Sequence, residues 1–152
     1  MGRMDWCEVS ERPISCTGDE VRAIFAGVLH ELRRAVRPQP TITENGCPRR
    51  MYMVPRRAGG GSAVSMTDLI GEYCPYGQPG DRLWVRETWC LRADGYGYRA
   101  DQDRTNAPRR WGTSTSMPRT ACRIMLEIVR VRVEYPLNAH FEWVISFRRV
   151  LP

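Results

Sequence analysis

The stretch that decides the fold is CPYGQPGDRLWVRETW, residues 74–89. Its first half holds two prolines and two glycines in the eight residues from Cys74 to Asp81, a composition typical of turns. In its second half the side chains alternate, with one phase formed by Leu83, Val85 and Glu87 and the other by Trp84, Arg86 and Thr88. The stretch therefore predicts a turn followed by a strand over residues 82–89, with both faces partly buried.

Further strands are predicted towards the C-terminus. Residues 122–134 carry apolar side chains in two successive phases, first Ile124, Leu126 and Ile128, and then Val129, Val131 and Val133. Such a change of phase between neighbouring residues indicates a β-bulge. A last strand over residues 141–150 places one apolar face, made of Phe141, Trp143, Ile145 and Phe147, towards the core. A short strand is expected at residues 96–100, followed by a polar loop over residues 101–118.

A helix is predicted to begin near Gly18. Thr17 and Glu20 have the spacing of a capping box, in which the two side chains satisfy free amides of the first turn. Beyond them an apolar stripe with helical spacing is formed by Val21, Ile24, Phe25, Val28, Leu29 and Leu32. Residues 41–67 show little periodicity and include three consecutive glycines, so we expect a flexible loop at about residues 55–67.

These elements together predict an α+β fold: a small, partly closed mixed β-barrel with the N-terminal helix packed on it. A length of 152 residues is typical of a single domain, so the whole chain, residues 1–152, is expected to form one.

The composition limits the chemistry. The chain has 23 basic residues against 17 acidic ones, a net charge of +6, and every basic residue is arginine. The absence of lysine excludes a lysine nucleophile, a Schiff base and a P-loop lysine. It leaves phosphate binding open, because the arginine fork fits phosphate oxygens. Codon bias in a GC-rich genome is the simplest origin of this composition, and the positive charge fits an anionic partner such as nucleic acid.

The six cysteines are scattered and form no C-x-x-C pair, so we expect free thiols, no metal site and no cofactor. No apolar run approaches the roughly 20 residues of a membrane span. The first eleven residues are polar and charged, unlike a secretory signal. The expected location is the bacterial cytoplasm, without membrane contact.

Several blocks resemble the phage and prophage branch of the ASCH family. They occur in order at residues 11–14, 20–27, 74–89, 116–124 and 143–149. The resemblance implies a PUA-like barrel, and ASCH domains are implicated in RNA binding. One branch removes acyl groups from acetylated cytidine with the motif G-x-K-x-x-T-x-R.

This sequence departs from that motif at both reactive positions. Gly27 and Arg34 match the glycine and the arginine, but Leu29 and Leu32 stand where the family has lysine and threonine. Only residues 135–140 stand where relatives carry a long acidic segment. The sequence therefore predicts that this amidohydrolase activity is lost. Both leucines prolong the apolar stripe, so we expect the helix to continue past Gly27 to about Arg34 and to fill the pocket.

The candidate nucleic-acid contacts are arginines and a tryptophan that could stack on a base, namely Arg34, Arg86, Arg109, Arg110 and Trp111. Trp84 and Trp143 lie in alternating strands and are expected in the core. Glu87 is the one candidate general base, although the favoured interpretation is an ion pair with an arginine such as Arg34 or Arg123.

Three functions remain open at this point. The first is a catalytically inactive module that binds RNA or single-stranded nucleic acid through arginines and aromatic side chains. The second is a phage-encoded inhibitor that binds a host protein, such as a defence complex. The third is a residual hydrolase that acts on a nucleoside or nucleic acid with Glu87 as its base.

Overall fold

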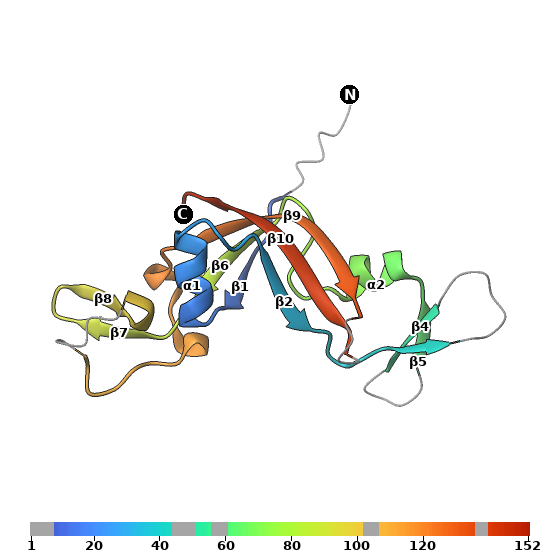
Figure 1. Ribbon diagram of the computed structural model, residues 1–152, viewed down its shortest axis with the longest axis horizontal. Coiled ribbons are helices and arrows are strands. Elements are labelled where there is room, and N and C mark those ends of the chain that lie inside the picture. Colours follow the sequence, from blue (N-terminus) through green and yellow to red (C-terminus); the bar gives the residue numbers. More distant parts are fainter. Residues whose placement is uncertain (1–7, 44–50, 56–60, 102–106, 136–139) are drawn as a thin grey trace, which may run out of the picture.

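The computed structural model describes residues 8–43, 51–55, 61–101, 107–135 and 140–152. Its centre is a five-stranded sheet (Figure 1), whose strands in spatial order are β1 (Glu11–Ser15), β6 (Arg82–Arg86), β9 (Met125–Glu134), β10 (Glu142–Val150) and β2 (Glu31–Ala35). β1 runs parallel to β6, and the other neighbours are antiparallel. The order of the strands therefore leaves β1 and β2 as the two edges.

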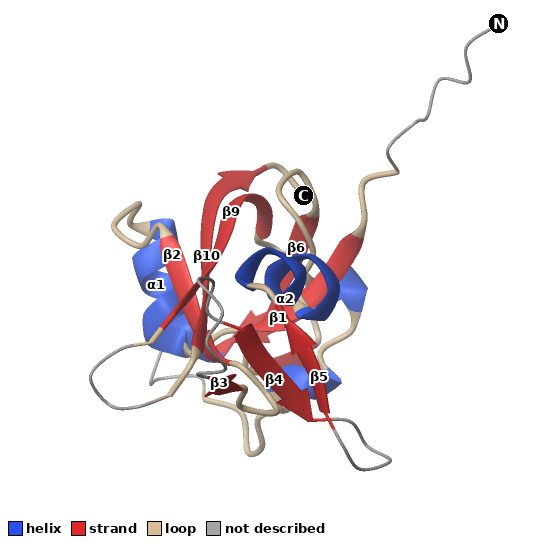
Figure 2. Ribbon diagram, turned by 90° about the vertical axis from the view of Figure 1, so that its right-hand side faces the viewer, coloured by secondary structure: helices blue, strands red, loops and turns tan. Residues whose placement is uncertain are grey.

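Two smaller sheets lie at opposite ends of the molecule (Figure 1). One consists of β3 (Thr41–Thr43), β4 (Met51–Pro55) and β5 (Gly61–Val64), and the other of β7 (Trp89–Arg92) and β8 (Gly95–Tyr98). The helices are α1 (Gly18–Phe25) and α2 (Met66–Tyr73), with short 3₁₀ turns η1 (Arg99–Asp101), η3 (Ser114–Ser116) and η4 (Arg119–Ala121). Figure 2 shows α2 beside the three-stranded sheet and α1 on the other side of the central sheet.

The predicted mixture of helices and strands is confirmed, but the strands in the described part of the chain form no closed barrel. The two edge strands are linked by a side chain instead. The Arg34 guanidinium of β2 donates to the carbonyl oxygen of Ser15, the last residue of β1, at 2.8 Å. A polar contact of this kind brings the edges together without a backbone ladder between them.

The turn that precedes β6 is organised by Asp81. One carboxylate oxygen accepts from the backbone amide of Gln78 at 2.9 Å, and the other accepts from the amide of Ser10 at 3.2 Å. Gly77 has a φ of +109°, and a Cβ there would lie 2.6 Å from an Asp81 oxygen. Only glycine fits this turn, which fixes the direction in which the chain enters β6.

The predicted β-bulge is confirmed in β9. Ser146 of β10 faces Arg130 and Phe147 faces Ile128, so Val129 is the extra residue of the bulge. Val129 is exposed, whereas the core-facing phase continues on either side of it through Ile124, Leu126, Ile128 and Val131. The bulge thus keeps both halves of a ten-residue strand apolar on the same face.

The core lies between the central sheet and its two helices. Val21 and Ile24 of α1 and Leu69 of α2 are buried against the strands. Trp143 is 1% exposed, so its predicted place in the core is confirmed. Trp84 is only partly buried and lies between the guanidinium groups of Arg86 and Arg119, at 5.7 and 5.9 Å from its ring, so its predicted core position is wrong.

The predicted continuation of the first helix to Arg34 is wrong. The capping box of Thr17 and Glu20 is present, but α1 ends at Phe25. Gly27 adopts a φ of +71°, and the amides of Gly27 and Val28 donate to the carbonyls of Ile24 and Ala23. This pair of bonds is the Schellman arrangement that ends helices at a left-handed glycine.

Beyond Gly27 the chain forms a strand that satisfies its backbone hydrogen bonds and still buries Leu32. β2 pairs with β10 over five residues, and Leu32 is 1% exposed in the core. Leu29 packs against the same core. The two leucines therefore fill the interior as expected, although from extended backbone and not from a helix.

The expectation of a region without regular structure at residues 41–67 is also wrong. β3 pairs with β4 and β4 with β5, and α2 starts at Met66. Of the flexible loop expected at residues 55–67, residues 56–60 lie outside the described part of the chain, whereas Gly61–Val64 forms β5. The missed signal for α2 is Ser65, whose hydroxyl accepts from the amide of Asp68 as an N-cap.

Within the described residues, neither helix has the length and apolar character needed to cross a membrane.

Candidate functional site

Arg34, the first predicted nucleic-acid contact, is fully engaged inside the protein. Its two terminal nitrogens donate to the two carboxylate oxygens of Glu20 at 2.9 and 3.0 Å. Glu20 also accepts from the amide of Thr17, so a single carboxylate caps α1 and holds β2. Arg34 therefore joins the helix to both edges of the sheet and is not free to bind a phosphate.

The two leucines beyond Gly27 are packed side chains. Leu32 is buried and Leu29 packs against the core. Cys16 lies beside Arg34, and burial, reinforced by the nearby Glu20 carboxylate, raises the pKa of its thiol to about 12. A thiol with so high a pKa stays protonated at neutral pH and is a poor nucleophile.

Glu87, the candidate general base, is 1% exposed and paired with an arginine, as the favoured interpretation predicted. Arg123 donates from Nε and from a terminal nitrogen to the two carboxylate oxygens, both at 2.8 Å. Both oxygens are thus occupied by a bidentate ion pair. The partner is Arg123 and not Arg34.

Arg123 connects four parts of the chain. Besides Glu87 it donates to Asp101 of η1 at 2.9 Å. Its guanidinium also lies 4.9 Å from the ring of Phe25 in α1 and 4.0 Å from the ring of Tyr98 in β8. This arginine therefore fixes the β7–β8 end of the molecule to α1 and to the end of β6.

We call residues 89–101 and 107–116 the lobe. Trp89 holds its two segments together: its backbone exchanges hydrogen bonds with Gly112 at 2.7 and 3.3 Å, and its indole nitrogen donates to Thr113 and Ser116, both at 3.2 Å. Its ring also makes an edge contact with Tyr96 at 5.9 Å. Residues 112–116, which belong to the predicted polar loop, are therefore packed onto the hairpin.

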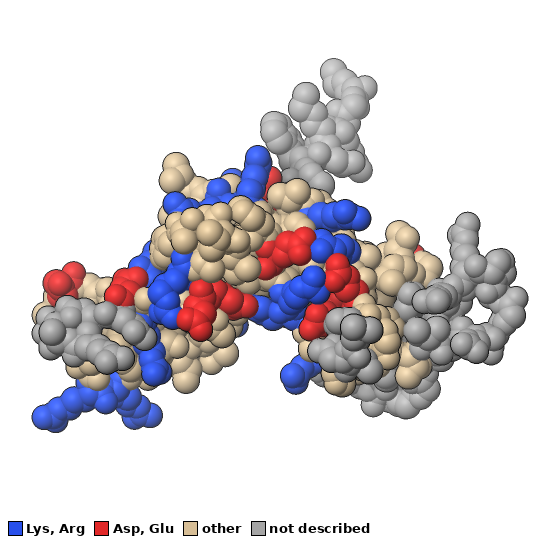
Figure 3. All heavy atoms as spheres, viewed as in Figure 1, with Lys and Arg blue, Asp and Glu red and all other residues tan. Residues whose placement is uncertain are grey.

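Three cationic side chains of the lobe are exposed. Among the described residues, no carboxylate forms an ion pair with Arg99, Arg109 or Arg110. Trp111 directly follows Arg110 in the chain and is half-buried, while Tyr96 is 38% exposed. Figure 3 shows basic side chains projecting from the lower side of this end of the molecule.

A hollow of about 310 Å³ adjoins the lobe. It lies between the start of α1 and the lobe and is lined by Thr17, Gly18, Asp19, Arg22, Thr88 and Arg99. Arg22 is ion-paired with Asp19 and donates to the carbonyl of Ala100 at 3.0 Å. Arg99 therefore lines a polar depression between α1 and the lobe.

Arg86, another predicted contact, lies between the sheet and the lobe. Its guanidinium makes a long contact of 3.4 Å to the carbonyl of Thr115 and lies near the ring of Trp84. Its Nε is buried and has no hydrogen-bond partner within the described structure. Arg86 is thus half-buried, unlike Arg109 and Arg110.

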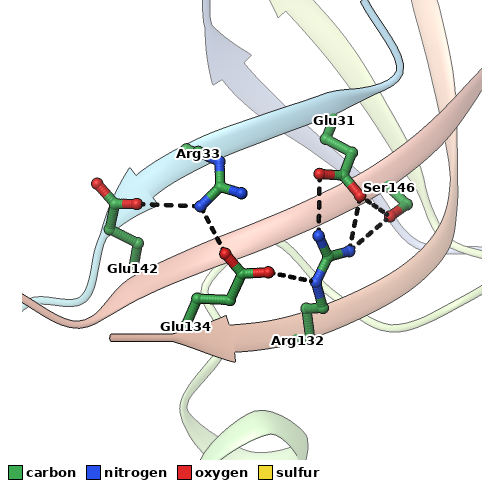
Figure 4. A network of polar contacts seen from close by, with 6 residues as sticks. All are labelled: Glu31, Arg33, Arg132, Glu134, Glu142 and Ser146. Carbon is green, nitrogen blue, oxygen red and sulfur yellow. Dashed lines mark hydrogen bonds and ion pairs between the residues drawn. The ribbon is translucent and has the colours of Figure 1, made fainter. Parts of the chain in front are cut away.

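A different arrangement covers β2, β9 and β10 on the central sheet (Figure 4). Arg132 donates two hydrogen bonds to Glu31 at 2.7 and 2.9 Å and one to Glu134 at 2.8 Å. Arg33 donates to Glu134 at 2.7 Å and to Glu142 at 3.4 Å. The bonds from Arg132 lower the pKa of Glu31 and Glu134, so both stay ionised and the charge of this surface is largely cancelled.

Sequence reasoning did not foresee this network. Its members in β2 are about a hundred residues away from those in β9 and β10, and only the pairing of the three strands brings them together.

Cys16, Cys74, Cys90 and Cys122 are free thiols, as predicted. Within the described part of the chain, no group of three or more histidine, cysteine, aspartate or glutamate side chains is placed to hold a metal ion. Cys7 and Cys47 lie outside the described residues.

Comparison of the chain with protein-family models, with curated proteins and with solved structures gave no match.

Proposed function

We propose that this protein is a catalytically inactive binding module of the ASCH type, with a PUA-like core, which holds RNA or single-stranded nucleic acid on the lobe. The family assignment rests on the sequence blocks at residues 11–14, 20–27, 74–89, 116–124 and 143–149. The contacts are Arg109, Arg110 and Trp111, with Arg99 at the edge of the adjoining hollow.

The observation that carries this proposal is the difference in pairing between the arginines. Arg33, Arg34 and Arg132 of the central sheet are bound to carboxylates, whereas Arg99, Arg109 and Arg110 have no described carboxylate partner and are exposed. Unpaired guanidinium groups attract phosphates, and an adjacent half-buried indole offers a flat surface on which a base can stack. Single strands suit this surface because their bases are free to stack.

The geometry of Glu87 favours binding over catalysis. A general base needs an oxygen within hydrogen-bond reach of its substrate. Both oxygens of Glu87 accept from Arg123, and the residue is almost completely buried. The leucines at positions 29 and 32 add no group that transfers a proton. The hydrolase alternative therefore has no reactive side chain to support it at these positions.

The test is the binding of a fluorescently labelled single-stranded RNA, measured by anisotropy at low and at physiological ionic strength. We expect binding that weakens steeply with salt, because each neutralised phosphate releases counterions. Changing Arg109 and Arg110 together to glutamine should weaken binding by about tenfold or more and lower the salt slope by about two. Trp111→Ala should weaken binding at all salt concentrations, because stacking does not depend on counterion release.

The matched control is Arg130→Gln, which removes an exposed arginine of β9 that has no described partner. It should leave the affinity nearly unchanged. Absence of binding at low salt would contradict the proposal. So would a loss of affinity in Arg130→Gln equal to that in the double variant of Arg109 and Arg110. Capture of a host protein that survives nuclease treatment, by a chain that binds no RNA, would support the host-inhibitor alternative.

A further inference from the structure

A second hollow lies on the other side of the molecule, where β2 ends. It has a volume of about 390 Å³ and is lined by Ala35, Val36, Arg37, Gln39 and His140. Pockets that bind small organic molecules have volumes of about 300 to 1,000 Å³. This one therefore has room for a nucleotide-sized ligand.

The walls of this hollow are joined firmly to each other. The side-chain amide of Gln39 donates to the carbonyls of Val36 and Phe141 at 2.7 and 2.9 Å, and its oxygen accepts from the amide of Phe141 at 2.6 Å. The amide of Val36 also donates to the carbonyl of Phe141 at 2.9 Å. Two segments that meet at the hollow, residues 35–39 and 140–141, are thus joined by three hydrogen bonds, and a fourth lies within the first segment, so the hollow is formed without a ligand.

Two groups at this hollow are suited to an anion. Arg37 is exposed and has no ion-pair partner among the described residues, and the imidazole of His140 is also exposed. Glu142 lies opposite Ala35 in the β2–β10 ladder, but its carboxylate is bound to Arg33. No carboxylate lines the hollow in the described structure.

The rest of the described lining consists of Gln39, whose side-chain amide is bound to backbone carbonyls, and of two aliphatic residues. Ala35 and Val36 contribute aliphatic surface beside the two basic groups. A ligand that matches both parts combines an anionic group with a flat or apolar body. The arginine fork binds phosphate oxygens with two parallel hydrogen bonds, and histidine adds a further donor.

We infer that this hollow binds a phosphate monoester carried on a nucleotide-sized body, with Arg37 and His140 on the phosphate and with Ala35 and Val36 against the body. Two sources share this chemistry: a free mononucleotide and the terminal phosphate of a nucleic-acid strand. The inference does not depend on the lobe, because no residue of the hollow belongs to it.

The experiment uses the full chain and adenosine 5′-monophosphate, with binding followed by calorimetry or by ligand-observed NMR. Adenosine without phosphate is the matched probe, and it should bind about tenfold more weakly or not at all, because it lacks the charge-assisted bonds. Arg37→Gln should cost about tenfold in affinity for the monophosphate, and His140→Gln a smaller factor. Both residues are exposed, so these variants should keep the thermal stability of the parent.

Two oligonucleotides of one sequence, with and without a 5′-phosphate, separate the sources. If the phosphorylated strand binds more tightly, and Arg37→Gln abolishes this difference, the ligand is the end of a nucleic-acid strand. Binding of the monophosphate without any advantage for the phosphorylated strand identifies a free nucleotide.

Failure of both phosphate-bearing probes to bind at millimolar concentration, or binding that Arg37→Gln leaves unchanged, would overturn the inference. Failure of this inference is distinct from failure of the proposal for the lobe, because binding of the strand without a terminal phosphate depends on the lobe contacts and not on Arg37.

Discussion

The surface of β2, β9 and β10 and the lobe use the same cation in opposite ways. On the sheet, Arg33 and Arg132 are bound between the carboxylates of Glu31, Glu134 and Glu142. On the lobe, Arg109 and Arg110 are exposed and have no ion-pair partner in the described structure. Figure 3 shows the contrast as red and blue side chains mixed over the centre, with blue alone at the lower edge of the lobe. The role of an arginine in this chain is therefore set by its neighbours in space.

Arg123 ties the lobe to α1 and to the end of β6, and its loss should have the largest effect. In Arg123→Met the Glu87 carboxylate stays buried without its partner, so the free energy of unfolding should fall by about 3 kcal/mol. Urea denaturation followed by tryptophan fluorescence measures this change.

The control for this prediction is Arg148→Met. Arg148 pairs with Glu127 in an exposed position, so its loss should cost less than about 1 kcal/mol. Adding Glu87→Leu to Arg123→Met should restore part of the stability, because the unpaired charge is then removed. Equal effects of the two methionine variants would show that the Glu87–Arg123 pair is no stronger than a surface pair.

The second prediction compares the two regions directly. Arg132→Gln should lower the free energy of unfolding by about 1 kcal/mol at low ionic strength, because it leaves Glu31 and Glu134 as like charges close to each other. The loss should shrink in concentrated salt, which screens charges at the surface.

The matching variant on the lobe is Arg109→Gln with Arg110→Gln. It should change the free energy of unfolding by less than about 0.5 kcal/mol, because no described ion pair is lost. The contrast between sheet and lobe would be wrong if the lobe variant were as destabilising as Arg132→Gln.

The smallest expected effect is a loss of folding stability at acidic pH. The hydrogen bonds from Arg132 hold the pKa of Glu31 below its usual value of 4.5, and those from Arg132 and Arg33 do the same for Glu134. In the unfolded chain these carboxyls take up protons at higher pH than in the folded protein. Their contribution to stability is therefore complete above pH 4.5 and is lost as the pH falls through the lower pKa of the folded state.

Thermal melting of the parent and of Arg132→Gln between neutral pH and a pH of about 3 tests this sign. The melting temperatures should converge as the pH falls below 4.5. A difference that stays constant over the whole range would mean that the network does not depend on ionised Glu31 and Glu134.

Much of the fold followed from local signals. The alternation over residues 82–89 predicted one strand, of which the first five residues form β6, with Leu83 and Val85 buried, whereas Trp89 begins β7. The phase change after Ile128 predicted the bulge, and the spacing of Thr17 and Glu20 predicted the start of α1. Each of these signals depends on neighbours within a few residues, which is why the sequence alone was sufficient.

The predicted C-terminal end of the first helix was wrong because two local sequence signals disagreed. The stripe that includes Val28, Leu29 and Leu32 favoured a longer helix, whereas Gly27 favoured a stop. Pairing with β10 stabilises the strand, because it satisfies the backbone hydrogen bonds of residues 31–35 while Leu32 is still buried in the core. Helical periodicity cannot report a partner strand more than a hundred residues away.

The candidate site divides in the same way. Trp111 and the pair Arg109 and Arg110 could be named from the sequence because they stand together in a polar segment. Arg34 also has a neighbouring arginine in the sequence, yet its guanidinium donates hydrogen bonds to Glu20 and to the Ser15 carbonyl. No sequence signal near Arg34 predicts that its side chain contacts the end of β1.

The sequence by itself determined the strand and turn pattern, the capped start of the first helix and a chemistry without lysine, because these properties reside in short segments and in composition. Only the tertiary structure decided which arginines are neutralised and which face solvent. Ion pairs join strands that are distant in the chain, and their strength depends on distance and burial, which no one-dimensional pattern contains.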